Sequence, residues 1–181
     1  DCALNQIKQS SFDLTFLHSK SFPTKFLNTK HFQETKLTFK KKVSAHQKIN
    51  MKVFSYVGEA NKELIDLTFE AGINSRYKLD PKLSPFFEEF YKKWLENSLN
   101  RTFADDVLIV KNKQGFLGFI TLRKEDESST SIGLMAVNKD FKRIGIGSAL
   151  IKAAENWVFS NNLQYLKVVT QKSNKNACLF Y

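Results

Sequence analysis

The segment from Val137 to Ser148 constrains the fold of this chain more than any other. It reads Val-Asn-Lys-Asp-Phe-Lys-Arg-Ile-Gly-Ile-Gly-Ser and follows an apolar run, Ser131 to Val137, that is typical of a strand. An amphipathic run with helical spacing follows it, from Ser148 to Ser160. A strand, a short glycine loop and a helix form a cradle for an anion, because unpaired N–H groups at a helix N-terminus attract phosphate. The segment therefore predicts a loop that binds a phosphate-bearing ligand, with Lys142 and Arg143 adding positive charge.

Two common phosphate loops do not fit this spacing. A Walker A loop requires Gly-x-x-x-x-Gly-Lys-Ser/Thr, which the sequence lacks. A Rossmann loop requires a third glycine, where Leu150 stands. It also requires an acidic residue about 20 positions further on, and residues 165–170 contain none.

The loop instead resembles the coenzyme A loop of the GNAT acetyltransferase superfamily, Gln/Arg-x-x-Gly-x-Gly/Ala, which here reads Lys142-Arg-Ile-Gly-Ile-Gly147. A second block agrees: a strand over Tyr165 to Thr170 precedes Asn174-x-x-Ala-x-x-x-Tyr181, which is similar to the family's tyrosine helix. The resemblance covers roughly residues 52–181. It implies an α/β fold with a central mixed sheet flanked by helices. It also implies two further strands after the tyrosine helix, so we expect residues beyond this sequence, or a partner chain, to complete the sheet.

The resemblance implies acetyl-CoA as co-substrate, without a metal, and assigns roles to particular residues. In the family, a bulge at the end of the strand leaves backbone N–H groups free for the thioester. The expected co-substrate site contains Met135, Ala136, Val137, Lys142, Arg143, Ile144, Gly145, Ile146, Gly147, Ser148 and Asn174. Lys142 departs from the usual Gln or Arg and would contact phosphate as a point charge.

Tyr181 is the expected general acid that protonates the departing thiolate. It lies about two helical turns after Asn174, so both side chains share one helix face. A phenol with a pKa of ~10 can protonate a thiolate whose thiol has a pKa of ~8.5. The alternatives remain that Tyr181 is a core tyrosine and that Asn174 caps the helix.

A third region resembles the substrate side of the bacterial TDP-fucosamine N-acetyltransferases. It comprises Ile73 to Leu79, Phe86 to Ser98 and Thr102-Phe103. The resemblance implies a small-molecule acceptor, the primary amine of a nucleotide-linked amino sugar for polysaccharide biosynthesis. The candidate acceptor-binding residues are Arg76, Tyr77, Trp94 and Arg101, each with a structural role as the alternative. Two other readings stay open: acetylation of a protein N-terminus, a lysine or another small amine, and a non-catalytic CoA-binding module.

The charge distribution argues against a nucleic-acid partner. The net charge is +10, but residues 1–50 hold nine lysines and three acidic residues, whereas residues 51–181 hold 19 basic and 15 acidic residues. The excess therefore lies mostly in the N-terminal part, and no aromatic-basic nucleic-acid module is recognisable. A mildly basic site also suits two polyanionic small molecules.

The remaining composition indicates a globular, cytoplasmic protein. No apolar run approaches the ~20 residues that cross a bilayer, so no membrane association is expected. Cys2 and Cys178 stand at opposite ends, which favours a reducing compartment. The three histidines all lie in the first 50 residues and form no metal-ligand pattern. A homodimer is compatible with this reading.

The sequence predicts an N-terminal arm over residues 1–50 and a GNAT domain over 51–181. Residues 31–43 partly alternate and contain several lysines, as in an edge strand. Helices are expected near residues 61–71, 86–100, 148–160 and 174–181. Strands are expected at residues 51–56, 106–111, 118–122, 131–137 and 165–170.

Overall fold

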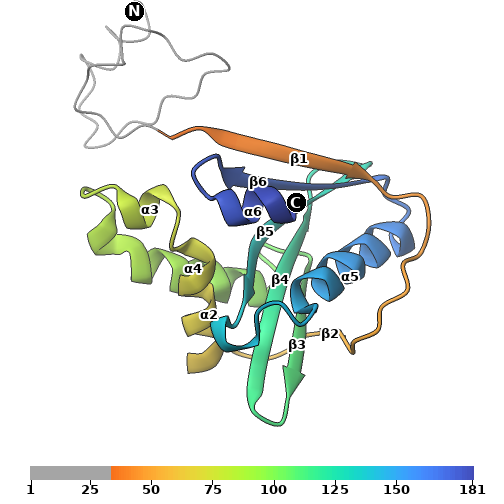
Figure 1. Ribbon diagram of the computed structural model, residues 1–181, viewed down its shortest axis with the longest axis horizontal. Coiled ribbons are helices and arrows are strands. Elements are labelled where there is room, and N and C mark those ends of the chain that lie inside the picture. Colours follow the sequence, from red (N-terminus) through yellow and green to blue (C-terminus); the bar gives the residue numbers. More distant parts are fainter. Residues whose placement is uncertain (1–33) are drawn as a thin grey trace, which may run out of the picture. The chain divides into compact units, whose positions relative to one another are not determined.

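The computed structural model describes residues 34–181 (Figure 1). These residues belong to one compact unit that runs from Gln33 to Tyr181. Most of the expected arm, with Cys2, His18 and His31, lies outside the described residues. The unit begins before residue 51 because residues 36–42 pair with its sheet.

The core of the unit is a six-stranded mixed sheet with the order β1-β6-β5-β4-β3-β2. Its strands are β1 (Lys36–Lys42), β2 (Phe54–Ser55), β3 (Asp106–Asn112), β4 (Gly115–Lys124), β5 (Ser129–Val137) and β6 (Tyr165–Gln171). The β5–β6 pair is parallel and the other pairs are antiparallel. This confirms the expected α/β fold with a mixed sheet.

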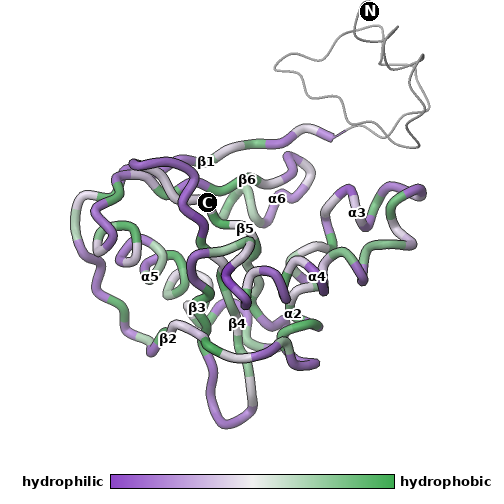
Figure 2. Tube along the Cα trace, turned by 180° about the vertical axis from the view of Figure 1, so that it is seen from behind, coloured by the Kyte–Doolittle hydropathy of each residue, from purple (hydrophilic) through white to green (hydrophobic). Residues whose placement is uncertain are grey.

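Helices cover both faces of the sheet (Figure 1). One face carries α2 (Lys62–Gly72), α3 (Arg76–Leu79), the 3-10 turn η2 (Ser84–Phe86) and α4 (Phe87–Leu99). The other carries α5 (Ile146–Ser160), which follows the 3-10 turn η3 (Lys139–Phe141), and α6 (Lys175–Phe180) follows β6. Two apolar clusters result, one between α5 and the sheet and one between α2, α4 and the sheet. Figure 2 shows hydrophobic residues along the inner strands β3 and β4.

The edge strand expected around residues 31–43 is confirmed as β1. All seven of its residues pair with β6, from Lys36 opposite Gln171 to Lys42 opposite Tyr165. Phe39 packs on the α5-side core, and Lys41 forms an ion pair of 2.6 Å with the buried Glu155 of α5. β1 is therefore an integral strand of the sheet.

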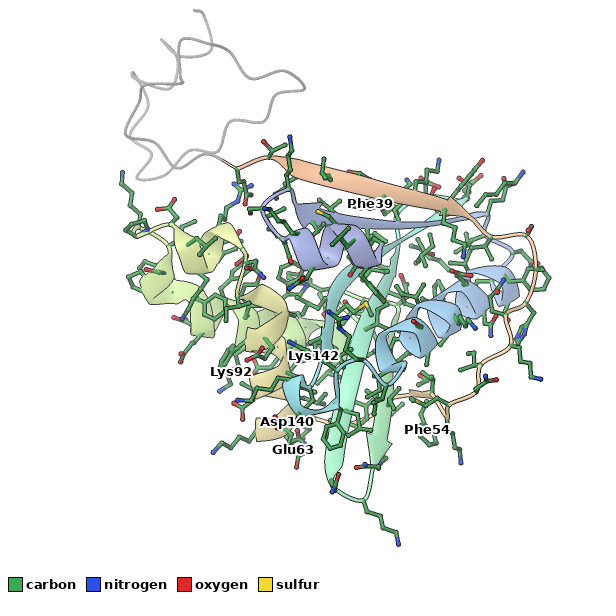
Figure 3. The ribbon with its side chains drawn as sticks, viewed as in Figure 1. Phe39, Phe54, Glu63, Lys92, Asp140 and Lys142 are labelled. Atoms are coloured by element: carbon green, nitrogen blue, oxygen red, sulfur yellow. The ribbon has the colours of Figure 1, made fainter. Side chains whose placement is uncertain are left out.

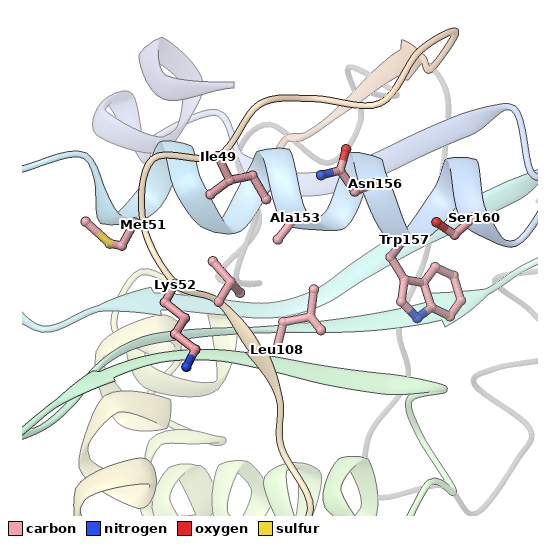
Figure 4. Close-up of a pocket in the computed structure, with 9 residues that line it drawn as sticks. Ile49, Met51, Lys52, Leu108, Ala153, Asn156, Trp157 and Ser160 are labelled. Atoms are coloured by element: carbon pink, nitrogen blue, oxygen red, sulfur yellow. The ribbon is translucent and has the colours of Figure 1, made fainter.

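The connection from β1 to β2 crosses the outer side of α5 to reach the opposite edge of the sheet (Figure 4). Gln47 holds it there, because its N–H and carbonyl form hydrogen bonds of 2.6 and 3.0 Å with the side chain of Asn156. Ile49, Met51 and Val53 turn inward and pack on the α5-side core. The strand expected at residues 51–56 consequently shortens to β2, since these alternating apolar residues cover α5 instead of extending the sheet.

Candidate active site

The loop between β5 and α5 has the backbone of an anion cradle. Arg143 and Gly145 both adopt left-handed conformations, with φ of 67° and 92°. Gly145 is the N-cap of α5 and supplies no side-chain cap, so the first N–H groups of the helix remain available to an anion. Lys142 and Arg143 are exposed beside them, and neither side chain forms a hydrogen bond or ion pair with another described residue. Figure 3 labels Lys142 on this loop.

Strands β5 and β6 separate beside this loop. Their parallel pairing covers only Ser129–Ile132 and Tyr165–Val168. β5 continues to Val137 and β6 to Gln171, but within the described sheet these last residues do not pair with each other. The sheet is therefore open between its two parallel strands, at the end where the loop leaves β5.

A β-bulge at Gly133 and Leu134 accompanies this separation. The register between β4 and β5 shifts there, with one extra residue in β5. The bulge also breaks the alternation of side chains, because Ile132 and Met135 pack on the α5 side while Leu134 packs on the α4 side. β5 is the strand in which the family resemblance implied a bulge, and the bulge lies just before Met135 to Val137.

The bulge sets the direction of the N–H groups that follow it. Leu134 N–H donates to Thr121 Oγ1 at 2.8 Å, and Asn138 N–H donates to a carbonyl of β4 at 2.8 Å. Because N–H directions alternate along a strand, those of Met135 and Val137 point away from β4. They face the opening beside β6, whereas the N–H of the intervening residue is directed at β4.

Tyr181 lies at the same opening. Its hydroxyl donates to Met135 Sδ at 3.5 Å, and its ring packs near Phe39, with 6.0 Å between the ring centroids. Burial raises the pKa of the Tyr181 phenol to about 12. The phenol therefore keeps its proton throughout the neutral range.

The neighbouring residues of α6 close one side of the opening. A Cβ built on Gly147 would lie 3.1 Å from the Phe180 ring and 3.7 Å from Met135 Cε, so loop, strand and helix converge here. Asn174 caps α6, since its side chain accepts a hydrogen bond of 3.3 Å from Ala177 N–H. Of the two roles left open for Asn174, capping is the one visible in the structure.

A pocket of about 580 Å³ lies against β5 beside α4. Its lining combines three aromatic rings with charged and small residues: Phe90, Trp94, Phe103, Arg123, Lys124, Glu125, Ser131 and Gly133. Gly133 of the bulge forms part of its wall, so the pocket lies next to the residues that face the opening. The Arg123 side chain is exposed at the end of β4 and forms no hydrogen bond or ion pair with other described residues.

Only Trp94 of the four expected acceptor-binding residues lines this pocket. The Tyr77 ring stacks on Phe90, with 4.0 Å between the ring centroids, and so supports a residue of the pocket wall without lining the pocket itself. Arg76 forms an ion pair of 2.6 Å with Glu34. These direct contacts therefore favour a structural role for Tyr77 and Arg76.

Arg101 lies at the other edge of the sheet, where it bonds Asp106 at 3.0 Å and the Tyr56 carbonyl at 3.2 Å. Arg123 lies in no sequence motif that would distinguish it from the charged residues that follow it, so the pocket alone identifies it.

Neither a metal site nor a membrane span is visible in residues 34–181. These residues contain no group of three or more His, Cys, Asp or Glu side chains that could hold a metal ion. In the same part of the chain, no helix is long and apolar enough to cross a membrane.

A mixed sheet that opens between two parallel strands, beside a glycine loop at a helix N-terminus, defines an acyl-CoA N-acyltransferase type of architecture. A family model described as the acetyltransferase (GNAT) family matches residues 62–181, more than half of the chain. The chain belongs to the GNAT acetyltransferase family, which confirms the resemblance drawn from its motifs.

Two curated relatives are similar over part of the chain. The dTDP-fucosamine acetyltransferase of Escherichia coli O6:H1 is 32% identical over 93 residues, which cover 51% of this chain and 39% of that enzyme. Streptothricin acetyltransferase A of Bacillus subtilis is 25% identical over 100 residues, which cover 53% of this chain and 58% of that enzyme. The chain thus spans about half the length of these relatives.

Solved structures share the fold at low sequence identity. A GNAT acetyltransferase from Elizabethkingia anophelis with acetyl-CoA bound has a TM-score of 0.53 and 19% identity, with 74% of each chain covered. The PaiA N-acetyltransferase from Thermoplasma acidophilum in complex with coenzyme A has a TM-score of 0.54 and 17% identity, with 72% of this chain and 87% of that one covered. At these identities the likeness supports the fold alone.

Proposed function

We propose that this protein is an acetyl-CoA-dependent N-acetyltransferase whose acceptor is the primary amine of a nucleotide-linked amino sugar. The proposal rests mainly on the opening between β5 and β6. There the N–H groups of Met135 and Val137 point away from β4, and the Tyr181 hydroxyl contacts the Met135 side chain. Family membership, the acetyl-CoA bound in the E. anophelis structure and the coenzyme A bound in the T. acidophilum structure support acetyl-CoA as the donor.

The residues fit this co-substrate chemically. The uncapped N-terminus of α5 and the exposed Lys142 and Arg143 suit its phosphates. Met135 and Val137 N–H would hold the acetyl oxygen, on which negative charge develops as the amine attacks. The new bond joins the acceptor nitrogen to the acetyl carbon, and the carbon–sulfur bond breaks.

Tyr181 would give its proton to the departing thiolate, while water takes the proton that the amine loses. The raised pKa of Tyr181 makes the phenol a weaker acid than an exposed one. A thiolate in the same partly buried opening is also poorly solvated, which raises the pKa of its thiol. The difference between the pKa of the phenol and the pKa of the thiol therefore becomes smaller.

The pocket beside α4 supports an acceptor with a nucleotide. Phe90, Trp94 and Phe103 offer faces on which a base or sugar ring can stack, and Arg123 offers a partner for a phosphate. The 32% identity with a dTDP-fucosamine acetyltransferase points the same way. The match to a streptothricin acetyltransferase favours the second candidate, a small amine without a nucleotide.

The test is thiol release from acetyl-CoA by the full chain, measured against TDP- and UDP-linked amino sugars, streptothricin and a lysine peptide. Turnover confined to a nucleotide sugar supports the proposal. Turnover confined to another amine contradicts the acceptor, and acetyl-CoA binding without turnover of any amine supports the non-catalytic module instead.

A further inference from the structure

Thr121 of β4 occupies an unusual place in the sheet. Its side chain is almost fully buried, at 2% exposure, and its hydroxyl oxygen accepts the Leu134 N–H at 2.8 Å. In a regular antiparallel ladder this N–H would bond a main-chain carbonyl of β4. The register shifts at this position, between Ile120 and Leu122. A side chain therefore replaces the ladder bond where β5 bulges.

The absence of a side chain at Gly133 leaves room for this hydroxyl. A Cβ at Gly133 would lie 2.9 Å from Thr121 Oγ1, which is closer than real Cβ atoms approach. The two residues are therefore matched, because the hydroxyl fills the space that a larger residue at 133 would need.

The hydrogen bond between Leu134 and Thr121 also affects the opening between β5 and β6. N–H directions alternate along a strand. The direction of the Leu134 N–H therefore sets the direction of the N–H groups of Met135 and Val137. If Leu134 lost its acceptor, the strand would rotate or seek a main-chain partner. Either movement would turn the Met135 and Val137 N–H groups out of the opening.

We propose that Thr121 is a positioning residue for acetyl transfer, holding the β5 bulge so that the Met135 and Val137 N–H groups point at the acetyl oxygen. The inference rests on the proposed function and adds the residue that fixes its geometry. Thr121 does not contact the acetyl group and acts through Leu134.

The test compares Thr121→Val, which keeps the shape but removes the acceptor, with Thr121→Ser, which keeps the hydroxyl. The dissociation constants of acetyl-CoA and of free CoA are measured for each, together with kcat. For Thr121→Val we expect the acetyl-CoA affinity to fall at least about fivefold relative to that of CoA, and kcat to fall about 10- to 100-fold, since misplacement of about 1 Å can cost this much. Thr121→Ser should recover both quantities to within about threefold of the parent protein.

Thr68→Val is the matched control, because Thr68 of α2 is also fully buried and its hydroxyl donates to the Leu64 carbonyl at 2.7 Å. It should lower the melting temperature without changing the ratio of the two affinities. Should Thr121→Val fail to fold, Gly133→Ala provides a second disturbance of the same hydroxyl.

Two results would overturn the inference. If Thr121→Val weakens acetyl-CoA and CoA equally with kcat unchanged, Thr121 has only a structural role while the proposed function stands. If the parent protein itself binds no acetyl-CoA, the proposed function fails, and the role of Thr121 fails with it.

Discussion

The hydroxyl of Tyr181 lies 3.5 Å from the sulfur of Met135, at the opening between β5 and β6. The two residues come from segments far apart in the sequence, and the contact brings the candidate proton donor to β5, whose Met135 and Val137 N–H groups point toward the opening. The phenol is partly buried and its pKa is raised to about 12, so it is protonated when a thiolate leaves.

Replacing Tyr181 with Phe should reduce turnover while preserving acetyl-CoA binding. The ring and its packing remain, and only the proton donor is lost, so we expect kcat to fall about 100-fold. Steady-state thiol release and isothermal titration with acetyl-CoA measure the two quantities. Tyr165→Phe is the matched control, because Tyr165 begins β6 and its ring lies under Lys40 Nζ at 3.7 Å, an interaction that Phe retains. Equal turnover of the two variants would rule out Tyr181 as the acid.

The raised pKa of Tyr181 also predicts how folding stability depends on alkaline pH. The folded protein retains this proton up to about pH 12, whereas the unfolded chain releases it near pH 10. The stabilisation is therefore complete below about pH 10 and is lost as the pH rises through about 12. Urea unfolding near pH 9 and near pH 11 should show a smaller loss of stability for Tyr181→Phe than for the parent. Parallel losses in both proteins would contradict the buried, neutral phenol.

Gly145→Ala should weaken acetyl-CoA binding through the backbone alone. Gly145 has a φ of 92°, but no atom lies within 4 Å of a Cβ placed there, so the cost is conformational. A left-handed alanine costs roughly 1–2 kcal/mol, which corresponds to about a 5- to 30-fold loss of affinity if the loop relaxes. Gly145→Asn is the control, because asparagine tolerates this conformation. Calorimetry should rank the proteins parent, Asn and Ala, and an alanine variant of unchanged affinity would show that the loop does not hold the co-substrate.

Removing Trp94 or Arg123 should weaken the acceptor and leave the donor unaffected. Both line the pocket beside α4, so Trp94→Ala and Arg123→Ala should each raise the acceptor KM about tenfold, with the acetyl-CoA KM within about threefold of the parent value. Arg101→Ala is the contrast, because its partners Asp106 and the Tyr56 carbonyl lie at the sheet edge, and it should lower the melting temperature instead. A change of acceptor KM in Arg101→Ala alone would place the acceptor elsewhere.

The loop and the order of elements could be predicted from the sequence because their signals are local. Gly145 and Gly147 between an apolar strand and an amphipathic helix indicate the cradle without knowledge of any distant residue. The helices near residues 61–71 and 86–100 appear as α2 and α4 for the same reason.

The non-local features could not be predicted. The alternation of Leu37 and Phe39 indicates a strand but does not say that its partner is β6, more than a hundred residues away. A single glycine at 133 is compatible with a bulge, a turn or a close contact, and Thr121 distinguishes these only once β4 and β5 are paired. The predicted acceptor-binding residues do not all lie at the pocket. Trp94 lines it, whereas Arg76 forms an ion pair with Glu34, which precedes β1.

Heteronuclear NMR of the full chain can follow the backbone amides of Met135 and Val137 while acetyl-CoA or CoA is added, and so tests whether these N–H groups bind the acetyl oxygen. We expect both amide protons to shift downfield with acetyl-CoA and to shift less with CoA, because only the former offers the carbonyl oxygen. Saturable binding of acetyl-CoA that leaves both amides unperturbed would contradict the proposed site between β5 and β6.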